Sequence, residues 1–131
     1  KVPYVIMHMK GTPGTMQHDP EYTDVVAEIK SFFDEQVRRC HELGLSGIIL
    51  DPGFGFGKTV THNYVILNRL HEFKGPGHLL MAGLSRKSMI NKVLGTQPAG
   101  ALNGTTVLNT IALMNFQAPK QEICYLLILP I

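Results

Sequence analysis

The sequence predicts an α/β fold in which about three βα units follow one another along a parallel sheet. Short apolar segments alternate with longer segments whose apolar residues recur at helical spacing. The connections between these segments are short, as expected where right-handed crossovers link parallel strands. The chain has 131 residues, of which 44% are hydrophobic, so we expect one domain around a single modest core.

The first unit combines a strand over residues 2–9 with a long helix, separated by a loop rich in glycine and proline. Asp19 and Pro20 predict the start of that helix, because Asp caps helix N-termini and Pro suits the first helical position. Apolar residues then recur at helical spacing, and Gly44 is the expected terminator.

The remaining units repeat this order of strand and helix. An apolar strand over residues 47–50 leads into a glycine-rich loop and then a helix that ends before Gly75. The other expected elements are a strand over residues 79–82, a helix over 88–93 and a helix over 105–114. Three parallel strands do not close on themselves, but they fit one portion of a TIM-type (β/α)8 barrel, a fold of about 250 residues.

Composition argues against several classes of protein. The net charge is only +2, and basic residues do not gather in a stripe, so no nucleic-acid partner is expected. Cys40 and Cys124 are too few and too far apart for a disulfide framework or a metal site, and we expect Cys40 to be a reduced structural thiol. We find no signal peptide or membrane-length apolar segment, which favours a cytoplasmic protein. Both ends lie in apolar, strand-like sequence, so we expect a piece of a longer protein.

Asp51 is the most informative candidate for a binding residue. It follows the buried strand 47–50 and precedes a loop with three glycines and two phenylalanines. A charge at the end of a buried strand is costly without a partner, and ligands bind at that end of the strands in α/β folds. A carboxylate accepts two N–H groups at once, which suits a guanidine-like heterocycle, and Phe54 or Phe56 could pack on its ring. The structural alternative is that Asp51 caps the following turn or forms a salt bridge.

A phosphate-binding P-loop is not expected, although Gly57-Lys58-Thr59 matches the end of that motif. The motif requires a glycine five residues before Gly57, where this sequence has Pro52. Lys58 is therefore given no role in binding.

Two further polar clusters follow predicted strands. Ser85-Arg86-Lys87-Ser88 places two cations and two hydroxyls at a helix N-terminus, which favours an anion or oxo group, with a solvated basic turn as the alternative. Met7 and His8 lie at the end of the first strand and by themselves indicate core packing. Because all three clusters follow parallel strands, we expect them to meet at one edge of the sheet.

Three motifs together resemble dihydropteroate synthase of folate biosynthesis. They are MHMKGTPGTMQ at 7–17, LDPGFGFGKT at 50–59 and GLSRKSMI at 83–90. The resemblance covers residues 1–115 and implies a pterin-binding barrel domain to which this chain supplies the fifth to seventh strands. Residues 116–131 do not match and are expected to form a divergent tail. The family condenses a dihydropterin pyrophosphate with 4-aminobenzoate, releasing pyrophosphate, and sulfonamides compete with the aminobenzoate.

The resemblance also implies which residues bind the pterin. Asp51 would accept hydrogen bonds from the amino and ring N–H groups. Lys87 would bind the oxo and ring-nitrogen side, and Gly83 would line the same pocket. Met7 and Phe56 would pack on the pterin ring.

For the second substrate, the resemblance implies that Ser88 holds the aminobenzoate carboxylate and that Arg86 shapes the same loop. The family uses Mg²⁺ and is usually homodimeric. The metal ligand, the first four strands and a late Arg-Val-His-Asp motif have no counterpart in this sequence. We therefore assign no catalytic residue, and we expect the chain alone to be incomplete and inactive as a synthase.

Two other interpretations stay open. A pterin-binding methyltransferase domain shares the barrel and the pterin pocket, but its substrate has no aminobenzoate carboxylate, so the Ser-Arg-Lys-Ser cluster favours the synthase. The chain could also be a non-catalytic barrel fragment, whose open strand edges invite pairing or aggregation.

Overall fold

Three parallel strands form the sheet of this protein, whose computed structural model describes residues 2–12, 14, 20–75 and 77–116. The strands are β1 (Tyr4–Met7), β2 (Ile48–Asp51) and β3 (His78–Leu80), in the order β1-β2-β3. Met7 pairs with Asp51, and Leu50 pairs with Leu80. The predicted α/β fold is confirmed, although β1 and β3 are shorter than predicted.

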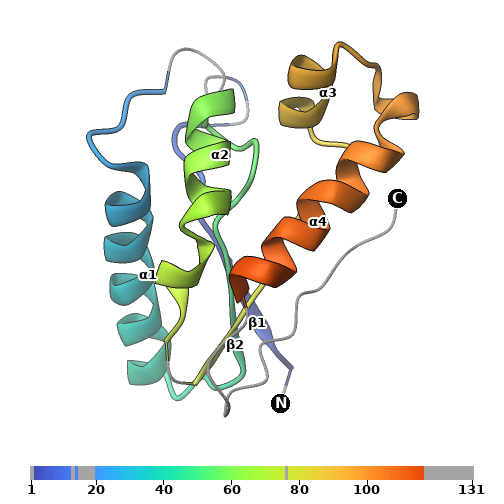
Figure 1. The fold of residues 1–131 in the computed structure, drawn as a ribbon. Coiled ribbons are helices and arrows are strands. Elements are labelled where there is room, and N and C mark those ends of the chain that lie inside the picture. Colours follow the sequence, from blue (N-terminus) through green and yellow to red (C-terminus); the bar gives the residue numbers. More distant parts are fainter. Residues whose placement is uncertain (1, 13, 15–19, 76, 117–131) are drawn as a thin grey trace.

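In the described part of the chain, four α-helices and two short 3-10 helices accompany the sheet. They are α1 (Val25–Glu42), α2 (Val60–Asn68), η1 (Leu70–Phe73), α3 (Ser88–Leu94), η2 (Pro98–Gly100) and α4 (Leu102–Phe116). The first two α-helices run side by side, and α4 packs beside α2 (Figure 1). The loops that follow the strands gather at the upper end of this view, where α2 and α3 begin.

The long helix α1 begins later than predicted. Its cap is Asp24, whose carboxylate accepts the N–H groups of the second and third helical residues at 2.9 and 3.0 Å. Pro20 lies outside the helix, and Asp19 lies outside the described residues. Gly44 follows the helix with a left-handed φ of 71°, so the predicted terminator is confirmed.

The last helix, α4, is longer at both ends than the predicted 105–114. It follows directly on η2, and the Ala101 carbonyl accepts a helical hydrogen bond from the Thr105 N–H at 2.9 Å. The extension places Thr105 in the second turn of the helix.

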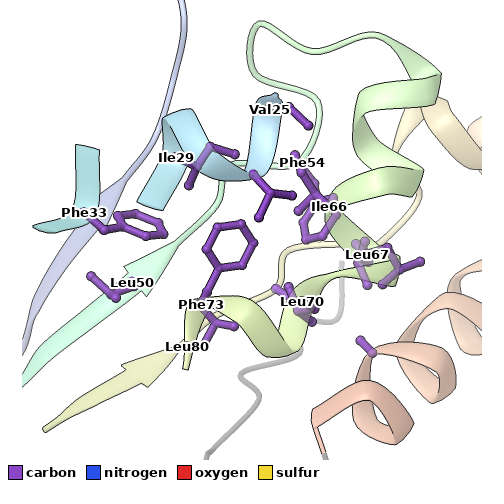
Figure 2. Close-up of a cluster of buried hydrophobic side chains, with 14 of the residues drawn as sticks. Val25, Ile29, Phe33, Leu50, Phe54, Ile66, Leu67, Leu70, Phe73 and Leu80 are labelled. Carbon is purple, nitrogen blue, oxygen red and sulfur yellow. The ribbon is translucent and has the colours of Figure 1, made fainter. Parts of the chain in front are cut away.

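The hydrophobic core lies between the sheet and the first two helices (Figure 2). Phe33 of α1 and Phe73 of η1 meet edge to face, with ring centroids 5.8 Å apart. Leu50 and Leu80 contribute from the strands. Phe54 of the glycine loop joins this core at 1% exposure, so Phe54 is a packing residue and only Phe56 remains a candidate for ring stacking.

The opposite face of the sheet is more open. Successive strand residues point to opposite faces, and Ile6 and Leu50 are buried beneath the helices. Val5 and Leu79, on the other face, are 45% and 36% exposed. By the strand register, Asp51 lies on this more open face.

The structure also bears on the cysteines and on membrane-spanning segments. Cys40 is a buried free thiol, as expected, whereas Cys124 lies outside the described residues. The helices of the described part of the chain are all too short or too polar to span a bilayer.

Candidate functional site

Asp51 ends the middle strand and is flanked on its face of the sheet by Met7 of β1. One oxygen, Oδ1, accepts the Gly53 N–H at 2.8 Å, so the turn-capping role that we considered is real. Burial raises the pKa of the Asp51 carboxyl, while the Gly53 N–H and the charges of Lys87 and Lys58 oppose this rise. The carboxylate therefore serves the local turn and also lies in the field of two cations.

Lys87 reaches the same place from the loop after β3. Its ammonium lies over the Phe56 ring, 4.5 Å from the centroid, in a cation–π contact. Burial lowers the pKa of Lys87, and the Asp51 charge opposes that shift. An acceptor, a cation and an aromatic ring thus come together from the ends of neighbouring strands, as the sequence predicted for Asp51, Lys87 and Phe56.

The loop after β3 forms a tight turn around the other predicted residues. Arg86 has a positive φ of 50°, and its Nη1 donates to the Pro98 carbonyl at 3.2 Å, which directs its side chain to η2. Gly83 is partly buried before the turn. Ser88 is exposed and is the first residue of α3. The turn therefore separates Lys87, which is associated with Asp51, from the Arg86 guanidinium.

Lys58 and His8 form a buried pair that the sequence analysis missed. The Lys58 ammonium donates to Nδ1 of His8 at 3.1 Å and to the backbone carbonyls of His8, Gly53 and Phe56 at 3.3, 3.0 and 3.0 Å. Burial lowers the pKa of Lys58 to about 8. Burial, followed by the Lys58 charge, lowers the pKa of His8 to about 4. With its ammonium turned inward on these acceptors, Lys58 ties the glycine loop to the segment after β1.

Close packing of these two segments requires glycine at two positions. A Cβ at Gly53 would lie 2.0 Å from the His8 carbonyl oxygen, and one at Gly57 would lie 2.2 Å from the Lys10 carbonyl oxygen. Both glycines have positive φ, 69° and 65°. The glycine-rich sequence therefore serves contact between two loops, in addition to any close approach of a ligand.

A polar hollow of about 600 Å³ lies on the α1 side of the glycine loop. Within it, Lys10 pairs with Glu28 at 2.9 Å and lies over the Tyr22 ring, 4.1 Å from the centroid. The Tyr22 hydroxyl donates to the Gly57 carbonyl at 2.7 Å. These groups satisfy one another and support the outer side of the loop, and neither Asp51 nor Lys87 lines this hollow.

Metal binding finds no support among the described residues. Within residues 2–12, 14, 20–75 and 77–116, no group of three or more His, Cys, Asp or Glu side chains could hold a metal ion. No Mg²⁺ ligand is therefore assigned among the described residues.

The fold and the site together define a class of protein. It is a parallel α/β protein in which loops at the carboxyl ends of the strands bring a carboxylate, an ammonium and an aromatic ring together. The chain belongs to the pterin binding enzyme family, whose model matches residues 1–116.

Dihydropteroate synthases are similar to most of this chain. The protein from Escherichia coli is 46% identical over 115 residues, which are 86% of this chain and 41% of that protein. A Yersinia pestis dihydropteroate synthase in complex with a sulfonamide drug has a TM-score of 0.85 at 39% identity, covering 88% of this chain and 42% of that one. The Thermus thermophilus enzyme in complex with 4-aminobenzoate has a TM-score of 0.83 at 40% identity, covering 95% and 49%. This chain thus spans less than half the length of these proteins.

Proposed function

We propose that this chain is part of a dihydropteroate synthase and supplies the fifth to seventh βα units of a TIM-type barrel. Two observations support the proposal that the chain is one part of a barrel. The chain spans 41% of the Escherichia coli synthase. Val5 and Leu79 leave one face of the parallel sheet partly exposed, as expected of strands whose inner face is completed by the rest of a barrel.

The observation that carries the proposed substrate is the placement of Asp51 and Lys87 after neighbouring strands, with the Lys87 ammonium over the Phe56 ring. A pterin presents an amino group and a ring N–H on one side and an oxo group on another. Asp51 would accept the N–H groups, and Lys87 would donate to the oxo group and ring nitrogen. Phe56 and Met7 would pack on the ring, and Gly83 would line the pocket.

In the proposed reaction, the amine nitrogen of 4-aminobenzoate attacks the methylene carbon of the dihydropterin pyrophosphate. The bond from that carbon to the pyrophosphate oxygen breaks, the electron pair leaves with pyrophosphate, and the amine loses a proton. The residues of this chain would bind and orient the two reactants, which converts an encounter in solution into a reaction at fixed geometry. Ser88 would hold the aminobenzoate carboxylate, and Arg86 would shape its loop.

Mg²⁺ belongs to this proposal only as a cofactor of the whole protein. No residue of this chain is assigned to it, because the described residues contain no group of three or more His, Cys, Asp or Glu side chains that could hold a metal ion. We also expect negligible synthase turnover from the 131-residue chain by itself, since it spans 41% of the Escherichia coli enzyme.

We further propose that the whole protein is a homodimer that uses α4. Four large apolar side chains of this helix, Leu102, Val107, Leu113 and Met114, are 50–67% exposed. Exposed apolar side chains gathered on one helix are typical of an interface. Sedimentation of the whole protein, with and without Leu113→Glu, tests this assembly.

Titration of the 131-residue chain with pterin, followed by the fluorescence of the pterin, tests the site. Asp51→Asn places an N–H where an acceptor is required, so we expect the Kd to rise about tenfold or more, as for a lost charge-assisted hydrogen bond. Lys87→Met should weaken binding similarly. Asp34→Asn, an exposed carboxylate on α1, is the matched control. Equal affinity of all four proteins would show that the pterin site is placed wrongly.

A second titration separates the synthase from a pterin-dependent methyltransferase. With pterin bound, 4-aminobenzoate should bind the wild-type chain and bind more weakly to Ser88→Ala. A chain that binds pterin but shows no saturable binding of 4-aminobenzoate would favour the methyltransferase.

A further inference from the structure

We propose that Thr105 of α4 is a positioning residue for Lys87, acting through the backbone of Arg86. The inference rests on the pterin site proposed above, because Lys87 is the member of that site whose direction Thr105 would fix. Thr105 lies outside the three motifs, and none of the roles described so far involves it.

The turn before Lys87 has a strained residue at its centre. The Lys87 N–H donates to the Leu84 carbonyl at 3.3 Å, which closes a four-residue turn with Arg86 in third place. Arg86 has a φ of 50°. A positive φ at this position normally selects glycine, because a Cβ crowds the neighbouring carbonyl. A residue with a side chain stays in this conformation only where contacts from outside the turn hold it.

Thr105 supplies one of these contacts. Its side chain is 7% exposed, and its Oγ1 accepts the Arg86 N–H at 2.9 Å. The same hydroxyl donates its only proton to the Ala101 carbonyl at 2.8 Å. Because the proton is committed to Ala101, a lone pair faces Arg86, and the hydroxyl is held ready as an acceptor.

A second contact holds the other end of Arg86. Its guanidinium donates to the Pro98 carbonyl of η2 at 3.2 Å. With both its amide and its side chain held, Arg86 turns the chain so that the next residue, Lys87, lies over Phe56. Relaxation of Arg86 to a negative φ would redirect the chain at Lys87 and remove the ammonium from this place.

Close packing of α4 on α3 brings Thr105 within hydrogen-bond distance of the Arg86 N–H. The preceding residue, Gly104, faces Ile90 of α3, and a Cβ at Gly104 would lie 2.4 Å from Ile90 Cγ2. The helices can therefore approach to a distance that a larger residue would not allow. The hydroxyl of Thr105 is in this way presented to the loop by a rigid helix.

Three variants test the proposal by pterin titration of the 131-residue chain. Thr105→Val removes the hydroxyl at nearly constant volume, and Thr105→Ser retains it. Thr106→Val is the matched control, because the Thr106 hydroxyl makes the same kind of bond, to the Leu102 carbonyl at 3.2 Å, but is exposed. We expect the Kd to rise about fivefold in Thr105→Val, which is the effect of one lost hydrogen bond. In Thr105→Ser and Thr106→Val the Kd should change less than about twofold, because the bond to the Arg86 N–H is retained.

Each result separates positioning from a purely structural role. A folded Thr105→Val protein with wild-type affinity overturns the proposal, even if its unfolding midpoint in urea has fallen. In an Arg86→Gly background, glycine adopts the positive φ without help, so the effect of Thr105→Val on the Kd should largely disappear. An effect of equal size in both backgrounds would show that Thr105 does not act through Arg86.

Hydrogen exchange of the Arg86 amide provides a test that needs neither pterin nor a folded Thr105→Val variant. In the wild-type chain this amide should exchange at least about tenfold more slowly than an exposed loop amide, because it is bonded to a buried oxygen. Rapid exchange overturns the contact itself. If the amide is protected but the wild-type chain binds no pterin, the proposed function fails while the link between Thr105 and Arg86 stands.

Discussion

The Lys58 ammonium and Nδ1 of His8 lie 3.1 Å apart, although the two residues are separated by 50 positions in the chain. Both are buried, at 4% and 7% exposure. Since the ammonium has only donors, Nδ1 must be the acceptor, and the imidazole is neutral with its proton on Nε2. The pair joins the loops that follow β1 and β2 and so helps to fix the position of Asp51 at the end of β2.

The first prediction concerns Lys58→Met, which keeps an apolar chain of similar length but removes the donor. Three buried carbonyls and a ring nitrogen lose their partner, so we expect a loss of about 2 kcal/mol or more in the free energy of unfolding. Urea unfolding at pH 7 measures the loss. Lys92→Met, at an exposed lysine of α3, is the control and should change stability by less than about 0.5 kcal/mol. Equal stability of both variants would contradict a supporting role for Lys58.

The second prediction concerns acid sensitivity that originates at His8. Its pKa is about 4 in the folded protein and 6.5 in the unfolded chain. As the pH falls below 6.5, the unfolded chain binds a proton that the folded protein does not, so stability decreases toward pH 4, by about 3 kcal/mol over the full range. Stability should be compared by urea unfolding between pH 5 and 7 in wild type and His8→Gln, whose amide oxygen can still accept from Lys58. Parallel stability curves for the two proteins would contradict the assignment to His8.

The third prediction separates backbone strain from collision in the glycine loop. In Gly44→Ala the new Cβ has no neighbour within 4 Å, so the only penalty is the positive φ. We expect the free energy of unfolding to fall by about 1–2 kcal/mol. Gly53→Ala and Gly57→Ala also drive a Cβ into the carbonyls of residues 8 and 10, and should cost at least about 2 kcal/mol more. Thermal unfolding of the three variants checks this order. Costs equal to that of Gly44→Ala would show that the two loops do not pack as closely as described.

The fourth prediction concerns the contact between α3 and α4. Gly104→Ala places a methyl group against Ile90, whereas Gly100→Ala places one 3.7 Å from Thr96 Cβ, an ordinary contact. We expect Gly104→Ala to be the more destabilising by about 1–3 kcal/mol. Ile90→Ala removes the colliding atom, so in the double variant Gly104→Ala should cost at least about 1 kcal/mol less than in wild type. Strict additivity in urea unfolding would argue against this contact.

Much of the architecture followed from local sequence. Alternating strand and helix periodicity predicted the three βα units, and Gly44 predicted the end of α1, because both signals depend on neighbouring residues only. The predicted start of α1 was wrong, because the helix is capped by Asp24 and not by Asp19. Asp19 precedes a proline and was the stronger local signal, but Asp24 is also paired with Arg69 at 3.1 Å, a residue 45 positions away.

By itself, the sequence determined the order of the elements and the positions of Asp51 and Lys87 at the ends of neighbouring strands, because parallel strands end at one edge of a sheet. Only the tertiary structure decided that Lys58 turns inward to His8 and that Thr105 holds the strained Arg86. These contacts join segments 50 and 19 residues apart. Their formation depends on how closely loops and helices approach in space, and no periodicity along the chain encodes that distance.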